Sequence, residues 1–131
     1  MEKKRILVGV SNYAKNCPEA RKLLLDKGYE LIEIDREDPY TKEELIQMAG
    51  DIDGVIAGME PWCEEVFAAA PKLKVVARFG VGFDTVDLEA AKRHGIIACN
   101  VRSFMLSNSV AEYALTLMLA AMKNVIPMDK V

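Results

Sequence analysis

The sequence has few of the residues on which disulfide scaffolds and zinc sites depend. Its 131 residues include one histidine and three cysteines, and Cys17, Cys63 and Cys99 lie far apart with no paired or histidine-flanked spacing. Neither a disulfide framework nor a metal site is therefore indicated. Reduced cysteines are typical of cytoplasmic proteins, so we expect the protein to be cytoplasmic.

The sequence also shows no strong excess of charge of either sign and no pattern from which we would expect targeting. Its net charge of −3, with acidic and basic residues interspersed, gives no reason to expect binding to nucleic acid or to an anionic membrane. The basic start, Met1 to Arg5, runs directly into a strand-like segment without a signal-peptide cleavage pattern. At this length, with 51% hydrophobic residues, we expect one full globular domain and no second one.

Strand-like and helix-like segments alternate along the chain as far as Asn100. The expected strands are short apolar runs, and the expected helices have proline, capping residues or glycine at their ends. We expect strands at 5–10, 29–34, 54–57, 74–78 and 96–99, and helices at 17–27, 41–50, 61–70 and 87–94. This alternation predicts an α/β fold, a flavodoxin-like parallel five-stranded sheet with helices on both faces.

One further helix differs from the others in being apolar nearly all round. Ser109 to Glu112 has the pattern of a capping box, which predicts a helix from Val110 to Met122. At roughly 15 residues this helix is shorter than the ~20 residues that a bilayer requires. It is either a core helix or one that packs on a second domain or a partner subunit. We favour the second interpretation, because the preceding helices already suffice to cover the sheet.

Two glycines, Gly80 and Gly82, follow the buried strand expected at 74–78. A dinucleotide-binding loop needs a third glycine and a helix start made of small residues, but the next positions hold Asp84 and Thr85. We therefore reject a cofactor loop here. The segment is either a tight turn or an anion-binding loop, and Arg78 at the carboxyl end of the strand favours a bound carboxylate or phosphate.

Three other functions lack the residues that they need. The only histidine, His94, stands before Gly95 at an expected helix end, where a capping role is more typical than catalysis. A phospho-receiver domain needs carboxylates after the first and third strands, where the sequence has Ser11 and Gly58. A flavin-binding domain needs a phosphate loop rich in serine, threonine and glycine after the first strand, and residues 11–16 do not form one.

Several motifs occur in order between residues 69 and 122. They are Arg78 to Asp87, Leu88 to Gly95, Asn100 and Ser109 to Glu112. Together they resemble the D-2-hydroxyacid dehydrogenase family, and within it the phosphoglycerate dehydrogenase branch; before residue 69 only the order of strands and helices is similar. The resemblance implies a two-domain enzyme that uses NAD or NADP to oxidise a small 2-hydroxy acid to a 2-oxo acid.

The resemblance also implies roles for particular residues. The backbone amides of Val81 and Gly82 would hold the substrate carboxylate in a pocket that Arg78 and Gly80 help to line. Asn100 and Ser109 would lie at the cleft or hinge between two domains. The apolar helix would begin the cofactor domain and form a homodimer interface through Val110, Tyr113, Ala114, Leu117 and Met118.

The same resemblance implies that this chain is a truncated piece of the enzyme. Residues 1–104 would be the substrate domain, and 105–131 a linker and the first helix of the missing cofactor domain. The cofactor motif and the catalytic arginine, glutamate and histidine have no match here, so we expect the chain alone to be inactive and to bind no cofactor. The sequence departs from the family at Arg102, usually proline, and in the loop Gly58 to Pro61, which lacks an arginine found in many phosphoglycerate dehydrogenases. The alternative is a free-standing flavodoxin-like module that binds small anions or has a regulatory role.

Overall fold

The structure is a computed structural model that describes residues 3–34 and 36–128. The chain divides after Val101 into two compact units. The first is an α/β domain and the second is helical. That the second unit begins a cofactor-binding domain stays a prediction.

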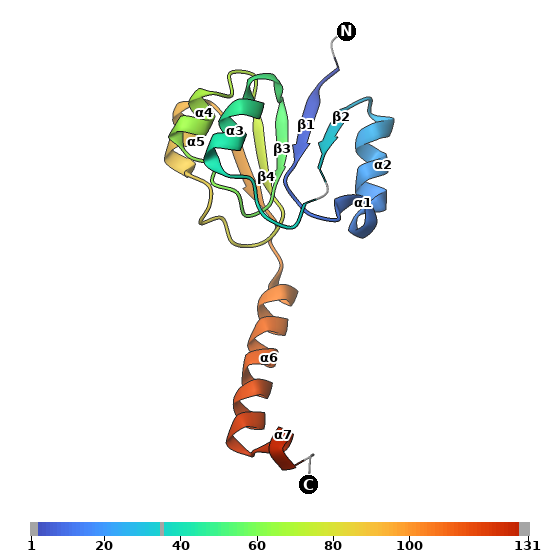
Figure 1. Ribbon diagram of the computed structural model, residues 1–131, viewed down its shortest axis with the longest axis vertical. Helices are drawn as coiled ribbons and strands as arrows, with labels where there is room; N and C mark the ends of the chain where they lie inside the picture. Colours follow the sequence, from blue (N-terminus) through green and yellow to red (C-terminus); the bar gives the residue numbers. More distant parts are fainter. Residues whose placement is uncertain (1–2, 35, 129–131) are drawn as a thin grey trace. The chain divides into compact units, whose positions relative to one another are not determined.

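The first unit is built on a five-stranded parallel sheet in the order β2-β1-β3-β4-β5 (Figure 1). This confirms the α/β class and the flavodoxin-like order expected from the sequence. β2 lies on one side of β1 and β3 on the other, so the chain connections diverge at the carboxyl ends of β1 and β3, where ligands bind in such sheets. The strands are β1 (Arg5–Val8), β2 (Glu30–Glu33), β3 (Gly54–Ala57), β4 (Val75–Arg78) and β5 (Ile97–Asn100).

Helices cover both faces of the sheet. The crossover from β1 to β2 runs in the opposite direction from the other three, and parallel crossovers are right-handed, so α2 lies on one face and α3, α4 and α5 lie on the other (Figure 1). Buried side chains such as Leu7, Val55, Phe67 and Val76 form the core. The helices are α1 (Tyr13–Asn16), α2 (Pro18–Asp26), α3 (Lys42–Met48), the 3-10 helix η1 (Ala49–Asp51), α4 (Glu64–Ala68) and α5 (Leu88–Arg93).

The helices expected from 41 and from 87 are confirmed, and in each the first expected residue is the N-cap. At the start of α3, Thr41 Oγ1 accepts from the Glu44 amide at 3.2 Å, and Glu44 Oε2 accepts from the Thr41 amide at 2.7 Å. At the start of α5, Asp87 accepts from the Ala90 amide at 2.9 Å. His94 is the C-cap residue of α5, as its position before Gly95 indicates.

The helix expected to begin at Pro61 begins instead at Glu64. Trp62 pairs with Val86 in an isolated parallel bridge, in which the Trp62 amide donates to the Thr85 carbonyl at 2.8 Å. The Asp87 amide donates to the Trp62 carbonyl at 2.9 Å. This tertiary pairing holds the chain extended at Trp62, and local helix signals cannot reveal it.

The second unit contains α6 (Phe104–Met122) and α7 (Val125–Met128). The expected start of the helix at Val110 was wrong. Ser103 is the N-cap, accepting from the Leu106 amide at 3.4 Å, whereas Ser109 lies inside the helix and donates its hydroxyl to the Met105 carbonyl at 2.9 Å. Ser109 to Glu112 is therefore not a capping box.

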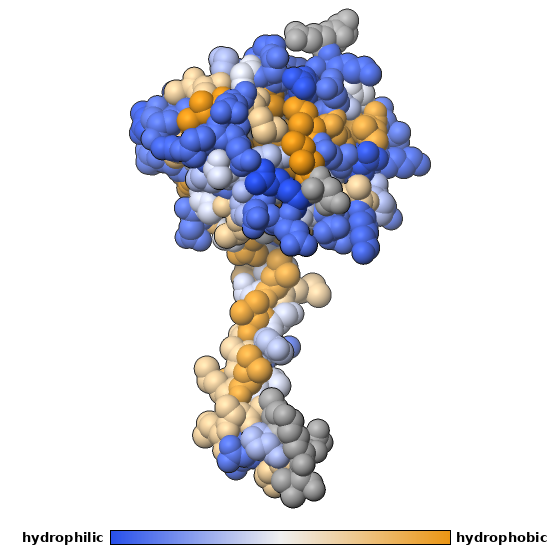
Figure 2. Space-filling view, in the orientation of Figure 1, coloured by the Kyte–Doolittle hydropathy of each residue, from blue (hydrophilic) through white to orange (hydrophobic). Residues whose placement is uncertain are grey.

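The longer helix removes the length argument against a bilayer. With 19 residues and a mean hydropathy of 1.3, α6 is long and apolar enough to cross a membrane by length and composition alone, which is weak evidence for a membrane role. None of its residues is buried within the chain, and Figure 2 shows apolar side chains along it. Helices that are apolar nearly all round are typically buried in a protein core or in a membrane.

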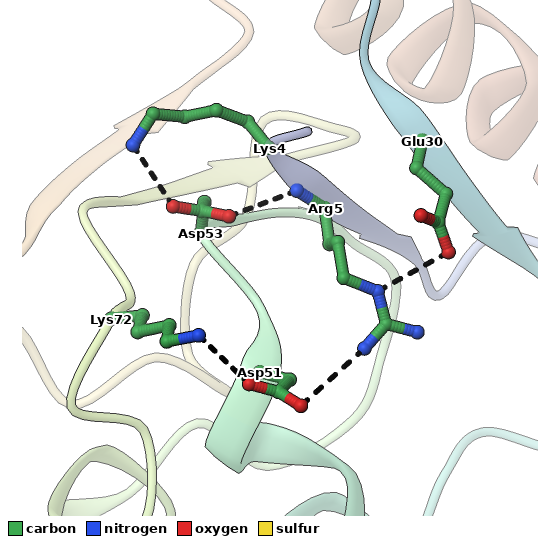
Figure 3. Close-up of polar contacts among 6 residues, drawn as sticks. All are labelled: Lys4, Arg5, Glu30, Asp51, Asp53 and Lys72. Carbon is green, nitrogen blue, oxygen red and sulfur yellow. Dashed lines mark hydrogen bonds and ion pairs between the residues drawn. The ribbon is translucent and has the colours of Figure 1, made fainter. Parts of the chain in front are cut away.

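Charged side chains form a network at the amino-terminal ends of β1, β2 and β3 (Figure 3). Asp53 accepts from the Arg5 amide at 2.9 Å and from Lys4 Nζ at 3.0 Å. The bond from the Arg5 amide is the main reason why the pKa of Asp53 lies below its usual value. The Arg5 side chain reaches Glu30 at 3.2 Å and Asp51 at 3.8 Å. The network thus lies at the other end of the strands from their carboxyl ends, where ligands bind in sheets of this kind.

We expect Asp53→Asn to destabilise the protein by about 1 kcal/mol at neutral pH, because the new amide oxygen accepts from Arg5 without a negative charge. The folded state lowers the pKa of Asp53, so its contribution is present above the unfolded pKa of about 3.9 and is lost as the pH falls through the lower folded value. Urea unfolding midpoints of variant and wild type should therefore differ at pH 7 and converge near pH 2. Asp26→Asn, at a carboxylate with no ion pair in the described chain, is the control, and a gap that persists in acid would contradict the prediction.

Candidate functional site: the glycine loop

The candidate site is the loop that follows β4, residues 79–84, here named the glycine loop. Arg78, the last residue of β4, delivers it at the carboxyl end of the sheet. The loop exposes three large apolar side chains, Phe79, Val81 and Phe83. Exposed apolar groups beside a ligand-binding edge are typical of a surface that a ligand or a partner covers.

Only one of the two glycines is required by backbone conformation. Gly80 has a φ of +146°, and a Cβ there would lie 2.8 Å from Arg78 Nη1, so no other residue fits without strain. Gly82 has no positive φ, and a Cβ there would meet only Asp84 Oδ2, at 3.4 Å. Gly80 thus has an unusual backbone angle, whereas Gly82 does not.

Two hydrogen bonds from the β5 side fix the direction of the loop peptides. The Val101 amide donates to the Gly80 carbonyl at 3.0 Å, and Asn100 Nδ2 donates to the Val81 carbonyl at 2.6 Å. In a trans peptide the N–H points opposite to the C=O. The amides of Val81 and Gly82 therefore both point away from β5.

These two amides are available to a ligand. In the described part of the chain no acceptor is found for the amide of Val81 or of Gly82, and both residues are exposed. The Gly80 amide, by contrast, already donates to the Arg78 carbonyl at 3.0 Å. Successive free N–H groups in a loop form a concave site that suits an anion.

Arg78 adds a positive charge next to these amides. Its guanidinium donates to the Phe79 carbonyl and, at 3.0 Å, to Met59 Sδ. The guanidinium also lies against the loop, because a Cβ added to Gly80 would be 2.8 Å from Arg78 Nη1. Among the residues that the structure describes, no carboxylate lies within ion-pair distance of Arg78. A guanidinium without an anionic partner beside free amides can bind a carboxylate.

A pocket of about 230 Å³ adjoins Arg78 where β1, β3 and β4 end. We name it the switch pocket, because the chain connections diverge there. Its wall includes Gly9, Arg36, Gly58, Met59, Arg78 and Phe79. A ligand held by the glycine loop therefore has room for the rest of its structure on the β1–β3 side.

The structure also reveals Glu60, which sequence reasoning missed. Its side chain is fully buried, and Oε1 accepts from the Gly58 amide at 2.9 Å and from Trp62 Nε1 at 3.4 Å. A Cβ on Gly9 or on Gly58 would collide with this carboxyl group, so both glycines leave room for it. The sequence did contain a signal for this residue, because an acidic side chain stands between Gly58 and Pro61, just after a buried strand.

The remaining predicted residues are distributed over both units. Asn100 belongs to the first unit and positions the glycine loop, whereas Ser109 belongs to the second, so a hinge role for the pair stays a prediction. Of the predicted interface residues, Ala114 is half-buried and the others are exposed within the chain, namely Val110, Tyr113, Leu117 and Met118. Over the described residues, no group of three or more histidine, cysteine, aspartate or glutamate side chains could hold a metal ion.

The glycine loop does not fit a dinucleotide. The next helix, α5, begins only at Leu88, so its N-terminal amides do not follow directly on Gly82. A pyrophosphate needs that direct succession of glycine loop and helix start. The loop therefore suits a small anion rather than a nicotinamide cofactor.

We expect Asn100→Ala to loosen the glycine loop, because the bond from Nδ2 to the Val81 carbonyl is lost. Backbone ¹⁵N relaxation should show the order parameters of Val81 and Gly82 falling from about 0.85 to below about 0.6. Asn16→Ala is the matched control, since its side chain makes no hydrogen bond in the described chain. Unchanged order parameters in Asn100→Ala would show that this bond does not hold the loop.

Comparison with known proteins agrees with the resemblance seen in the sequence. The family model of the D-isomer specific 2-hydroxyacid dehydrogenase catalytic domain matches residues 8–126. A glyoxylate reductase of Pyrococcus furiosus is 33% identical over 114 residues, which cover 86% of this chain and 34% of the relative. A D-3-phosphoglycerate dehydrogenase of Mycobacterium leprae is 49% identical over 65 residues, which cover 50% of this chain and 12% of the relative.

A solved structure shows the same fold. The NAD⁺-bound 3-phosphoglycerate dehydrogenase of Entamoeba histolytica matches with a TM-score of 0.75 and 30% identity, over 91% of this chain and 39% of that one. The chain thus spans about a third of the length of the glyoxylate reductases that it matches. Since the family model matches residues 8–126 and the fold is shared, the chain belongs to the D-isomer specific 2-hydroxyacid dehydrogenase family.

Proposed function

We propose that this chain is the substrate-binding part of an NAD- or NADP-dependent dehydrogenase that oxidises a small 2-hydroxy acid to a 2-oxo acid. The observation that carries the proposal is the pair of unpartnered amides, Val81 and Gly82, beside Arg78, which has no carboxylate partner in the described chain. Relatives named as oxidoreductases of such acids support it.

The role of these groups is to bind and orient the substrate. Two N–H groups that point the same way and a guanidinium hold a carboxylate at defined positions, and this fixes the direction of the neighbouring reacting carbon. Asn100 and Val101 hold the loop carbonyls in place before the ligand arrives. Such preorganisation avoids ordering the loop at the moment of binding.

We further propose that this chain alone transfers no hydride and binds no cofactor. Oxidation of the substrate requires a hydride acceptor and a base for the hydroxyl proton, and a bound nicotinamide supplies the acceptor. The glycine loop does not fit a dinucleotide, and Gly80, Val81 and Gly82 have no side chain that could accept the proton. We therefore assign no catalytic residue to this chain. We propose that the base and the binding site for the nicotinamide belong to a cofactor domain outside it.

We propose that the intact protein is cytoplasmic, binds neither nucleic acid nor membrane, and forms a homodimer through α6. The family match extends across α6, which supports a role for this helix in the dehydrogenase fold rather than in a bilayer. A second copy of the chain would bury the exposed side chains of Val110, Tyr113, Leu117 and Met118.

Light scattering after size exclusion tests the homodimer. We expect the mass of a dimer for the wild type and of a monomer for Leu117→Glu, because a charge in an apolar interface is not compensated. Thr116→Glu is the control at an adjacent polar position. In the wild type the Thr116 hydroxyl donates to the Glu112 carbonyl. A wild-type monomer at high concentration would contradict an interface on α6.

The carboxylate site is tested by removing one N–H. Gly82→Pro deletes the amide, whereas Gly82→Ala keeps it and adds a methyl group in ordinary contact with Asp84. Loss of one hydrogen bond to a charged group should weaken binding of glyoxylate about 10- to 100-fold in Gly82→Pro, as measured by calorimetry. Gly82→Ala should bind like the wild type. Equal affinity of all three proteins would show that this amide does not hold the carboxylate.

A further inference from the structure

Met59 lies directly beside the guanidinium that the proposed carboxylate site uses. β3 and β4 pair in parallel with Ala57 opposite Arg78, so the residues that follow β3 meet the end of β4. There Arg78 Nη2 donates to Met59 Sδ at 3.0 Å, and both residues line the switch pocket. A chemical change at this sulfur atom therefore acts on Arg78 directly.

Met59 is open to solvent, unlike the residue that follows it. Glu60 is fully buried and its Oε1 accepts from the Gly58 amide at 2.9 Å, whereas the Met59 residue is 60% exposed. Peroxides convert exposed methionine to methionine sulfoxide, and dedicated reductases reverse this change. Met59 thus combines access for an oxidant with a direct contact to a ligand-binding cation.

The acceptor strength of the Met59 side chain sets how freely Arg78 can bind a ligand. A thioether sulfur accepts hydrogen bonds only weakly. Since no carboxylate in the described chain lies within ion-pair distance of Arg78, the guanidinium is available to an anion. Oxidation makes the methionine side chain polar, and the new oxygen, with its partial negative charge, accepts more strongly from a cation. The sulfoxide would therefore compete with a substrate carboxylate for the same guanidinium.

We propose that Met59 is a site of reversible oxidation, at which hydrogen peroxide converts the thioether to a sulfoxide that holds Arg78 and weakens binding of the substrate carboxylate. The inference rests on the carboxylate site proposed above. In the reaction a lone pair of Met59 Sδ attacks one oxygen of the peroxide, the S–O bond forms as the O–O bond breaks, and water leaves with both protons. The sulfur is oxidised by two electrons and the peroxide is reduced.

Glyoxylate binding before and after peroxide treatment tests this site. The chain is treated with hydrogen peroxide and then with dithiothreitol, which restores oxidised thiols, and both reagents are removed before calorimetry. We expect the affinity of the wild type to fall about 3- to 10-fold, because the sulfoxide takes one hydrogen bond from the ligand. In Met59→Leu the treated and untreated proteins should bind alike. Met105→Leu, at another exposed methionine, should remain as sensitive as the wild type.

Mass spectrometry of the treated wild type separates this inference from the proposed function. Unchanged affinity overturns the role of Met59 and leaves the carboxylate site standing, whether or not the spectrum shows Met59 oxidised. An equal loss of affinity in Met59→Leu does the same, since another residue is then responsible. If the untreated wild type does not bind glyoxylate, the carboxylate site itself is overturned and the inference with it. Recovery of affinity on incubation with methionine sulfoxide reductases is the result expected of a reversible site.

Discussion

The planarity of two peptide bonds determines what the glycine loop can do. Because the carbonyls of Gly80 and Val81 are bonded from the β5 side, the amides that follow them must point the other way. The parallel sheet makes this possible, since β4 and β5 end at the same edge and bring Asn100 next to a loop nineteen positions earlier in the chain. The candidate site is thus a consequence of strand register as much as of glycine.

The glycine loop and the switch pocket meet at Arg78 and Phe79, at the carboxyl ends of the strands. The glycine loop offers free N–H groups and a guanidinium, whereas in the switch pocket the amides of Gly9, Gly58 and Phe79 already have acceptors within the protein. Gly9 and Gly58 are required there for space rather than for backbone freedom, because neither has a positive φ.

The sequence predicted those features that depend on local chemistry. The third strand and the helix starts expected at 41 and at 87 are confirmed, because each depends on residues close together in the chain. The start of α4 was wrong, since Trp62 pairs with Val86 through a contact that is remote in sequence. The start of α6 was also wrong, because Ser103 and Ser109 both have the chemistry of a cap and only the structure distinguishes them. The loop-positioning role of Asn100 and the buried place of Glu60 depend on tertiary contacts and were not visible in the sequence.

The proposed site requires the amides of Val81 and Gly82 to bind the carboxylate of a small 2-oxo acid. Residue-resolved ¹H–¹⁵N spectra of the chain during a titration with glyoxylate test it most directly, because a new hydrogen bond shifts the resonance of its own donor. We expect these two amides to show the largest saturable shifts in the protein. Saturable shifts that occur elsewhere, with Val81 and Gly82 unmoved, would contradict it.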